Sequence, residues 1–135
     1  MDFAELKDRF LVDENLQTER LAKLVERAVN YCVVHKDGTV ELKDSRLPGR
    51  DQVKLVLSAR LIASRLEKSV PDDVTVEQLA EYTGLPKNQA AARAKDCVDE
   101  RFAERTGRGA YKARPLKVEE FLGTLSSQKV SRSAS

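Results

Sequence analysis

The chain has 135 residues, and its 24 lysines and arginines against 22 aspartates and glutamates leave a formal net charge of +2. This length favours one globular unit, and a near-neutral balance argues against a protein that coats nucleic acid through bulk charge. Since no apolar run is long enough to span a membrane and no secretory signal opens the chain, we expect a cytoplasmic protein.

The first part of the chain, residues 1–46, predicts helices followed by a β-hairpin. Residues 3–11 can form a short helix, and residues 18–30 form a stronger one, because apolar residues recur there at helical spacing after a threonine cap. Asp37 and Gly38 separate two alternating β-branched runs, which predicts strands near 31–35 and 39–43 joined by a type I′ turn. This part is also a candidate dimerisation region.

The second part, residues 47–125, begins within a connector over 44–50. Residues 51–68 predict a long helix that is apolar on nearly all sides, which is typical of a central, buried helix. A short helix over 76–82 follows, with Thr75 and Gln78 spaced as a capping box.

The next break is at Gly84, where the short helix must stop and the chain reverse, and Pro86 suits the first turn of a new helix. We expect that helix to run to about residue 100 with four inward positions: Ala90, Ala94, Cys97 and Val98. Residues 101–114 predict a second hairpin that turns at 106–109, and residues 116–125 predict a short helix. The serine-rich tail, residues 126–135, is expected to be disordered.

Residues 74–114 resemble a winged helix-turn-helix. The residues that carry the resemblance are Leu79 and Ala80, Gly84 four residues after Ala80, Leu85, and the spacing of Ala90, Ala94 and Cys97. The order helix, helix-turn-helix and hairpin over 51–114 is similar to that of winged-helix regulators of archaea. The expected fold class is therefore mainly α with two β-hairpins, a winged helix-turn-helix with a helical N-terminal extension.

The resemblance implies binding to double-stranded DNA, with helix 86–100 in the major groove and the 101–114 wing on the backbone. Residues 86–114 hold 8 basic and 4 acidic side chains, so this segment is the basic part of the chain. Asn and Gln can read adenine, Arg can read guanine, and wing cations suit phosphates. The predicted DNA-binding residues are Lys87, Asn88, Gln89, Arg93, Lys95, Arg105, Arg108, Lys112 and Arg114.

Other interpretations of the same residues stay open at this point. The basic side chains can be a solvated face, or the fold can serve as a protein-interaction subunit of a transcription or nucleic-acid-processing assembly. Ala91 and Ala92 interrupt the reading face, and Asp96, Asp99 and Glu100 repel phosphate, which favours backbone and shape contacts over dense base reading. The helices over 18–30 and 51–68 either bury one another in a monomer or form a two-fold homodimer.

An enzyme is the least supported class. His35 is the only histidine, Cys32 and Cys97 are 65 positions apart, and the glycines at 107 and 109 lack the Lys-Ser/Thr of a phosphate loop. Cys97 falls on an inward helix face and His35 at an exposed strand end. We therefore predict no catalytic residues, no metal site and no cofactor.

Overall fold

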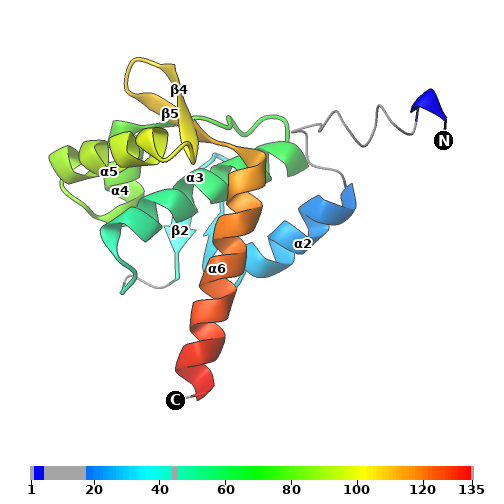
Figure 1. Cartoon of the computed structure of the whole chain (residues 1–135). Helices are drawn as coiled ribbons and strands as arrows, with labels where there is room; N and C mark the ends of the chain where they lie inside the picture. Colours follow the sequence, from blue (N-terminus) through cyan, green and yellow to red (C-terminus); the bar gives the residue numbers. More distant parts are fainter. Residues whose placement is uncertain (1, 5–17, 44–45, 135) are drawn as a thin grey trace.

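The computed structural model describes residues 2–4, 18–43 and 46–134, with side chains of the last helix described up to Leu125. In this part of the chain five helices accompany two small antiparallel sheets (Figure 1). The elements in order are α2 (Thr18–Ala28), β1 (Cys32–Val34), β2 (Val40–Leu42), α3 (Gly49–Leu66), β3 (Val74–Thr75), α4 (Val76–Thr83), α5 (Lys87–Asp99), β4 (Ala103–Gly107), β5 (Ala110–Ala113) and α6 (Pro115–Ala134). The prediction of an α-rich chain with two hairpins is confirmed, whereas the helix predicted over 3–11 lies mostly outside the described residues.

The two sheets are separate. The first holds β1 and β2, with Val33 opposite Glu41, and the second has the strand order β3-β5-β4. The two residues of β3 pair with β5, with Val74 opposite Tyr111, which the sequence did not predict. A strand of two residues has no period to detect, so its pairing is decided by the hairpin that lies beside it.

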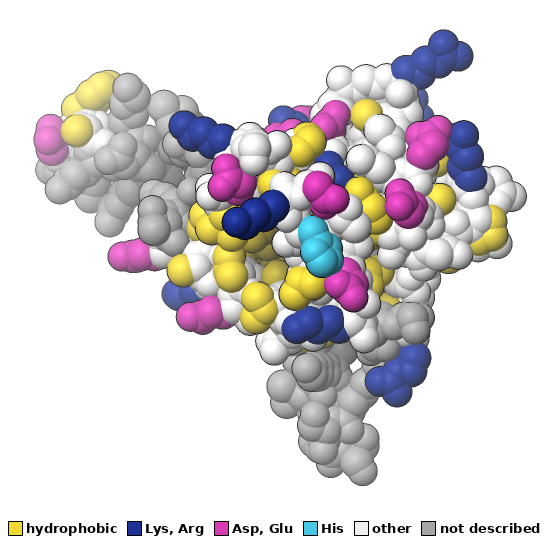
Figure 2. Space-filling view, turned by 180° about the vertical axis from the view of Figure 1, so that it is seen from behind, with side chains coloured by type: hydrophobic (Ala, Val, Ile, Leu, Met, Phe, Trp, Pro, Cys, Tyr) yellow, Lys and Arg dark blue, Asp and Glu magenta, His cyan; other side chains and the backbone are white. Residues whose placement is uncertain are grey.

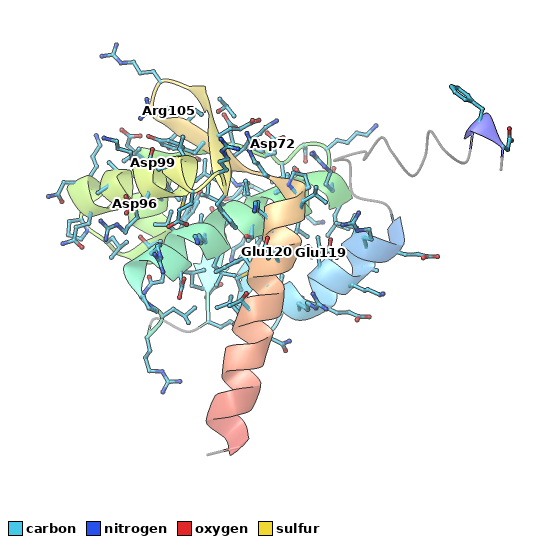
Figure 3. The ribbon with its side chains drawn as sticks, viewed as in Figure 1. Asp72, Asp96, Asp99, Arg105, Glu119 and Glu120 are labelled. Carbon is cyan, nitrogen blue, oxygen red and sulfur yellow. The ribbon has the colours of Figure 1, made fainter. Side chains whose placement is uncertain are left out.

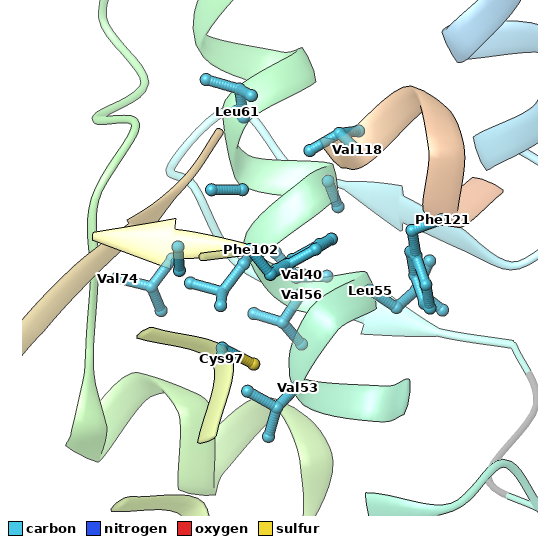
Figure 4. Close-up of a cluster of buried hydrophobic side chains, with 14 of the residues drawn as sticks. Val40, Val53, Leu55, Val56, Leu61, Val74, Cys97, Phe102, Val118 and Phe121 are labelled. Carbon is cyan, nitrogen blue, oxygen red and sulfur yellow. The ribbon is translucent and has the colours of Figure 1, made fainter. Parts of the chain in front are cut away.

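Helix α3 is the centre of the core, as its apolar circumference predicted. All residues from Gln52 to Ile62 except Lys54 are buried, and α2, α4, α5, α6 and both sheets pack around this helix (Figures 1 and 4). Phe102 and Phe121 close the cluster with an edge-to-face contact at 5.6 Å between ring centroids. Burial of α2 against α3 through Leu24 and Ala28 supports packing within one chain.

Among the side chains that the structure describes, the most buried charged one is Arg60, in the middle of α3, which is 1% exposed. Its Nε donates to the Gly38 carbonyl oxygen at 2.9 Å, and its Nη1 donates to the Asp73 carbonyl oxygen at 2.9 Å. Nη1 also lies 3.3 Å from the Pro71 carbonyl oxygen, and Nη2 donates to the Tyr82 hydroxyl at 3.1 Å. One guanidinium thus joins the first hairpin, the loop before β3 and α4.

The turn of the first hairpin differs from the prediction. Gly38 has φ +95, but Asp37 is not among the residues with positive φ, so a type I′ turn is wrong. The Gly38 N–H bonds to the His35 carbonyl at 2.9 Å and the His35 N–H to the Thr39 carbonyl at 2.8 Å. This three-residue loop ends in a left-handed glycine, a form that needs positive φ at one position only.

Helix α6 continues to Ala134, so the predicted end at Leu125 is wrong. The helix therefore includes most of the segment that was predicted to be disordered. Its buried side is the predicted one, formed by Val118, Phe121, Leu122 and Leu125. Serines are weak helix formers, but residues 126–134 contain no glycine or proline that would stop a helix already nucleated on the core.

Candidate nucleic-acid interface

The α4–α5 pair is built by local signals in the sequence. The Thr75 hydroxyl accepts from the Gln78 N–H at 3.1 Å while the Gln78 side chain accepts from the Thr75 N–H at 3.0 Å, the predicted capping box. Gly84 ends α4 with φ +78, and its N–H bonds to the Ala80 carbonyl at 2.9 Å. Such a left-handed residue lets α5 leave at a steep angle from α4.

Helix α5 has one buried side and one exposed side. Ala90, Ala94 and Cys97 are each 0% exposed, and Val98 is partly buried, as predicted. The predicted contact residues of this helix, Lys87, Asn88, Gln89, Arg93 and Lys95, are all exposed. Three small side chains at the crossing let α5 approach its neighbours closely while its long polar side chains face solvent.

The β4–β5 hairpin follows α5 directly and protrudes from the molecule beside it (Figure 1). Gly107 pairs with Ala110, so Arg108 and Gly109 form the tip, where Gly109 has φ +71. Arg105 and Arg108 are exposed, with the Arg105 guanidinium 5.9 Å from the Tyr111 ring centroid. Lys112 and Arg114, on the return strand, are half-buried.

Several of the predicted contact residues already have an acidic partner within the chain. Lys87 Nζ lies 3.0 Å from a Glu77 carboxylate oxygen, and Arg93 Nε lies 3.1 Å from a carboxylate oxygen of Asp96. Lys112 Nζ lies 3.4 Å from a Glu104 carboxylate oxygen. The hydrogen bond from Lys87 holds the pKa of the Glu77 carboxyl below its ordinary value. Figure 3 shows Asp96 and Asp99 on α5, below Arg105 on the hairpin, so both signs of charge are present on this side of the molecule.

Four of the predicted cations have no carboxylate within ion-pair distance among the residues that the structure describes: Lys95, Arg105, Arg108 and Arg114. Asn88, Gln89 and Arg93 meet along one shallow groove of about 770 Å³. Arg50, at the amino end of α3, lines the same groove and was not predicted. The sequence does contain a signal for Arg50: it is a basic residue in the first turn of a helix, where acidic residues are favoured.

Arg101 was not predicted either, and it is the one described residue other than glycine with positive φ, at +64. The Phe102 N–H bonds to the Cys97 carbonyl at 2.9 Å and the Arg101 N–H to the Val98 carbonyl at 3.0 Å. This pair of bonds is a Schellman motif, which ends α5 and directs the chain into β4. The position that glycine usually takes is held here by an exposed arginine.

Replacing Arg101 with glycine is expected to raise the free energy of unfolding by about 1 kcal/mol, because the left-handed conformation is strained for a side chain and relaxed for glycine. Urea denaturation of the purified variant measures this. The control is Asp99→Gly in the last turn of α5, which should lower stability by about 0.5–1 kcal/mol. If Arg101→Gly and Asp99→Gly lower the free energy of unfolding equally, the backbone at Arg101 is not strained.

Cys32 and His35 lie outside α5 and the β4–β5 hairpin, and Cys97 is on the buried side of α5. Burial raises the pKa of the Cys32 thiol to about 11 and that of the Cys97 thiol to about 12, which disfavours the reactive thiolate. His35 is exposed at the end of β1, with its Nε2 3.2 Å from a Glu41 carboxylate oxygen. Within residues 2–4, 18–43 and 46–134, no three metal-ligating side chains of His, Cys, Asp or Glu come together.

A second surface feature is an apolar groove of about 260 Å³ between α2, β1 and α3. Figure 2, seen from the side opposite to Figure 1, shows hydrophobic side chains gathered beside the single histidine. Val29, Val33 and Leu66 are the exposed apolar residues here, at 46%, 39% and 61%. In the part of the chain described, no helix combines the length and apolar character that crossing a membrane requires.

Comparison with known proteins gives no relative whose functional residues can be compared with these. No protein-family model, no curated protein and no solved structure matches the chain.

Proposed function

We propose that the chain is a DNA-binding protein with a winged helix-turn-helix, acting as a transcriptional regulator, in which α5 enters the major groove and the β4–β5 hairpin lies on the adjacent backbone. The observation that carries the proposal is the two-sided character of α5. Ala90, Ala94 and Cys97 are fully buried, and every contact residue predicted on this helix is exposed. A helix that reads a groove has to present such a free polar side.

The arrangement around α5 supports the same proposal. The order α3, α4, α5 and then the β4–β5 hairpin is the order helix, helix-turn-helix and hairpin on which the resemblance rests. The hairpin tip carries Arg108 beside an exposed Arg105. Cations in such a loop suit phosphate contacts, which give affinity without sequence choice.

The alternative, a winged helix that binds another protein through the same face, predicts exposed apolar residues on α5 or the hairpin. The large hydrophobic side chains exposed in the described part of the chain are Phe3, Val29, Val33, Leu66 and Leu116. None of these is on α5 or on the hairpin. The face formed by these two elements therefore favours a charged partner over an apolar one.

The test is binding to a pool of random duplexes at several salt concentrations, with the double variant Lys95→Ala/Arg108→Ala. We expect log K to fall with log salt for the native chain, with a slope reduced by about 2 in the double variant, because each phosphate contact releases about one counterion. At fixed salt the double variant should bind about tenfold or more weakly.

The matched control is Lys23→Ala/Arg27→Ala, which removes the same charge from the exposed side of α2. The docking model is wrong if both double variants change the salt slope equally, because the effect would then be net charge alone. The single variant Arg93→Ala should have a smaller effect than Arg108→Ala, since Asp96 already neutralises Arg93.

A further inference from the structure

A small, partly open cavity lies where the carboxyl half of α3 meets β4 and β5, outside the groove along α5. Its volume is about 140 Å³, well below the roughly 300 Å³ at which pockets for drug-sized molecules begin. Arg65 comes to it from α3, Lys112 and Arg114 from β5, and Glu104 from β4. The space therefore fits a small ion, and its charged lining decides which kind.

The charges around the cavity are unbalanced toward the positive side. Lys112 lies 3.4 Å from Glu104, the one carboxylate in the lining. Arg65 has a long contact of 3.8 Å with Asp72, which is not part of the lining. Three cations against one lining carboxylate leave an excess of +2, which favours an anion.

Arg114 is the one cation of the lining that has no acidic partner among the described residues. Its Nε is buried and has no hydrogen-bond partner, and no ion pair of Arg114 is found among the residues described. The guanidinium offers a fork of donors that matches two oxygens of one oxyanion.

The backbone holds Arg114 in place. Its N–H bonds to the Phe102 carbonyl at 2.9 Å, and its own carbonyl accepts from the Lys117 and Val118 N–H groups at 3.0 Å each. Pro115, the first residue of α6, also lines the cavity, and the first turn of this helix contains no acidic residue. The positive end of the α6 dipole thus adds to the cationic lining.

We propose that this cavity binds a phosphate group, with the Arg114 guanidinium as the principal donor and Arg65 and Lys112 as flanking charges. The group belongs either to a nucleic-acid backbone or to a free phosphate ion. In the first case the site rests on the proposed function and adds Arg65 of α3 to the contacts of the hairpin. In the second case the site is independent of it.

The test uses the Nε–H signals of arginine in ¹H–¹⁵N spectra of the full chain, titrated with sodium phosphate against sodium chloride at equal ionic strength. We expect a saturable shift of the Arg114 signal with phosphate only. Arg114→Gln should weaken phosphate binding roughly tenfold or more, as loss of a charged fork implies, and Arg114→Lys less. Arg27→Gln on the exposed side of α2 is the control and should leave phosphate binding unchanged.

The proposal is overturned if phosphate gives no saturable shift, or if all arginine signals move alike as with chloride. A duplex titration then separates the two sources. A nucleic-acid phosphate moves the Arg114 signal on adding DNA, and Arg114→Gln lowers the salt slope by about 1. If DNA does not bind at all, the phosphate titration still decides the site, so failure of the proposed function and failure of this inference are distinguishable.

Discussion

Replacing Arg60 with alanine is expected to lower the free energy of unfolding by about 3–5 kcal/mol, one of the largest effects of any single change in the chain. The substitution removes the donors that satisfy the carbonyls of Gly38 and Asp73 and leaves a void along the buried stem. Buried carbonyls without a donor and an unfilled cavity are both destabilising. Urea denaturation followed by circular dichroism measures the loss.

Two further variants serve as comparisons for Arg60→Ala. Tyr82→Phe removes only the hydroxyl that accepts from Arg60 Nη2 and should lower stability by about 1 kcal/mol. Arg65→Ala, on the same helix but partly exposed, should change stability by less than about 0.5 kcal/mol. A loss at Arg60 no greater than that at Arg65 would show that the guanidinium does not join the three segments.

Replacing Ala94 with leucine is expected to lower the free energy of unfolding by about 2–3 kcal/mol, because the added methyl groups have no space at a fully buried helix crossing. Winged-helix proteins usually carry larger aliphatic residues where Ala90, Ala94 and Cys97 stand. The Ala94→Leu variant therefore tests whether α5 packs closely against its neighbouring helices or leaves unfilled space in the core. In the structure, Ala90 and Ala94 are fully enclosed, which indicates close approach.

The matched control is Ala92→Leu, two residues away on the exposed side of the same helix, which should stay within about 0.5 kcal/mol of the native chain. Thermal denaturation of both variants under identical conditions gives the comparison. Stability of Ala94→Leu at or above the native value would mean that the crossing has room, and that the small residues are not required there.

Local chemistry made most of the fold predictable. The capping box at Thr75, the reversal at Gly84 and the apolar circumference of α3 each indicated an element that the structure contains. These signals act over a few residues, so one sequence is enough to recognise them.

What could not be predicted depends on contacts between distant segments. The pairing of β3 with β5 and the hydrogen bonds of Arg60 join residues that no local pattern connects. At the candidate interface, the exposed side of α5 followed from helical spacing. The pairing of Lys87 with Glu77 did not, because it depends on how α4 and α5 are arranged in space.

Under the proposed function, the acidic partners of Lys87, Arg93 and Lys112 have a consequence for how the chain would search DNA in a cell. A phosphate that replaces an internal carboxylate exchanges one ion pair for another, so these residues add little net attraction to duplexes of arbitrary sequence. Proteins that search a chromosome are held back by the vast excess of irrelevant sites. A groove-reading helix that carries its own counterions would be retained weakly on those sites and remain free for the few whose shape suits it.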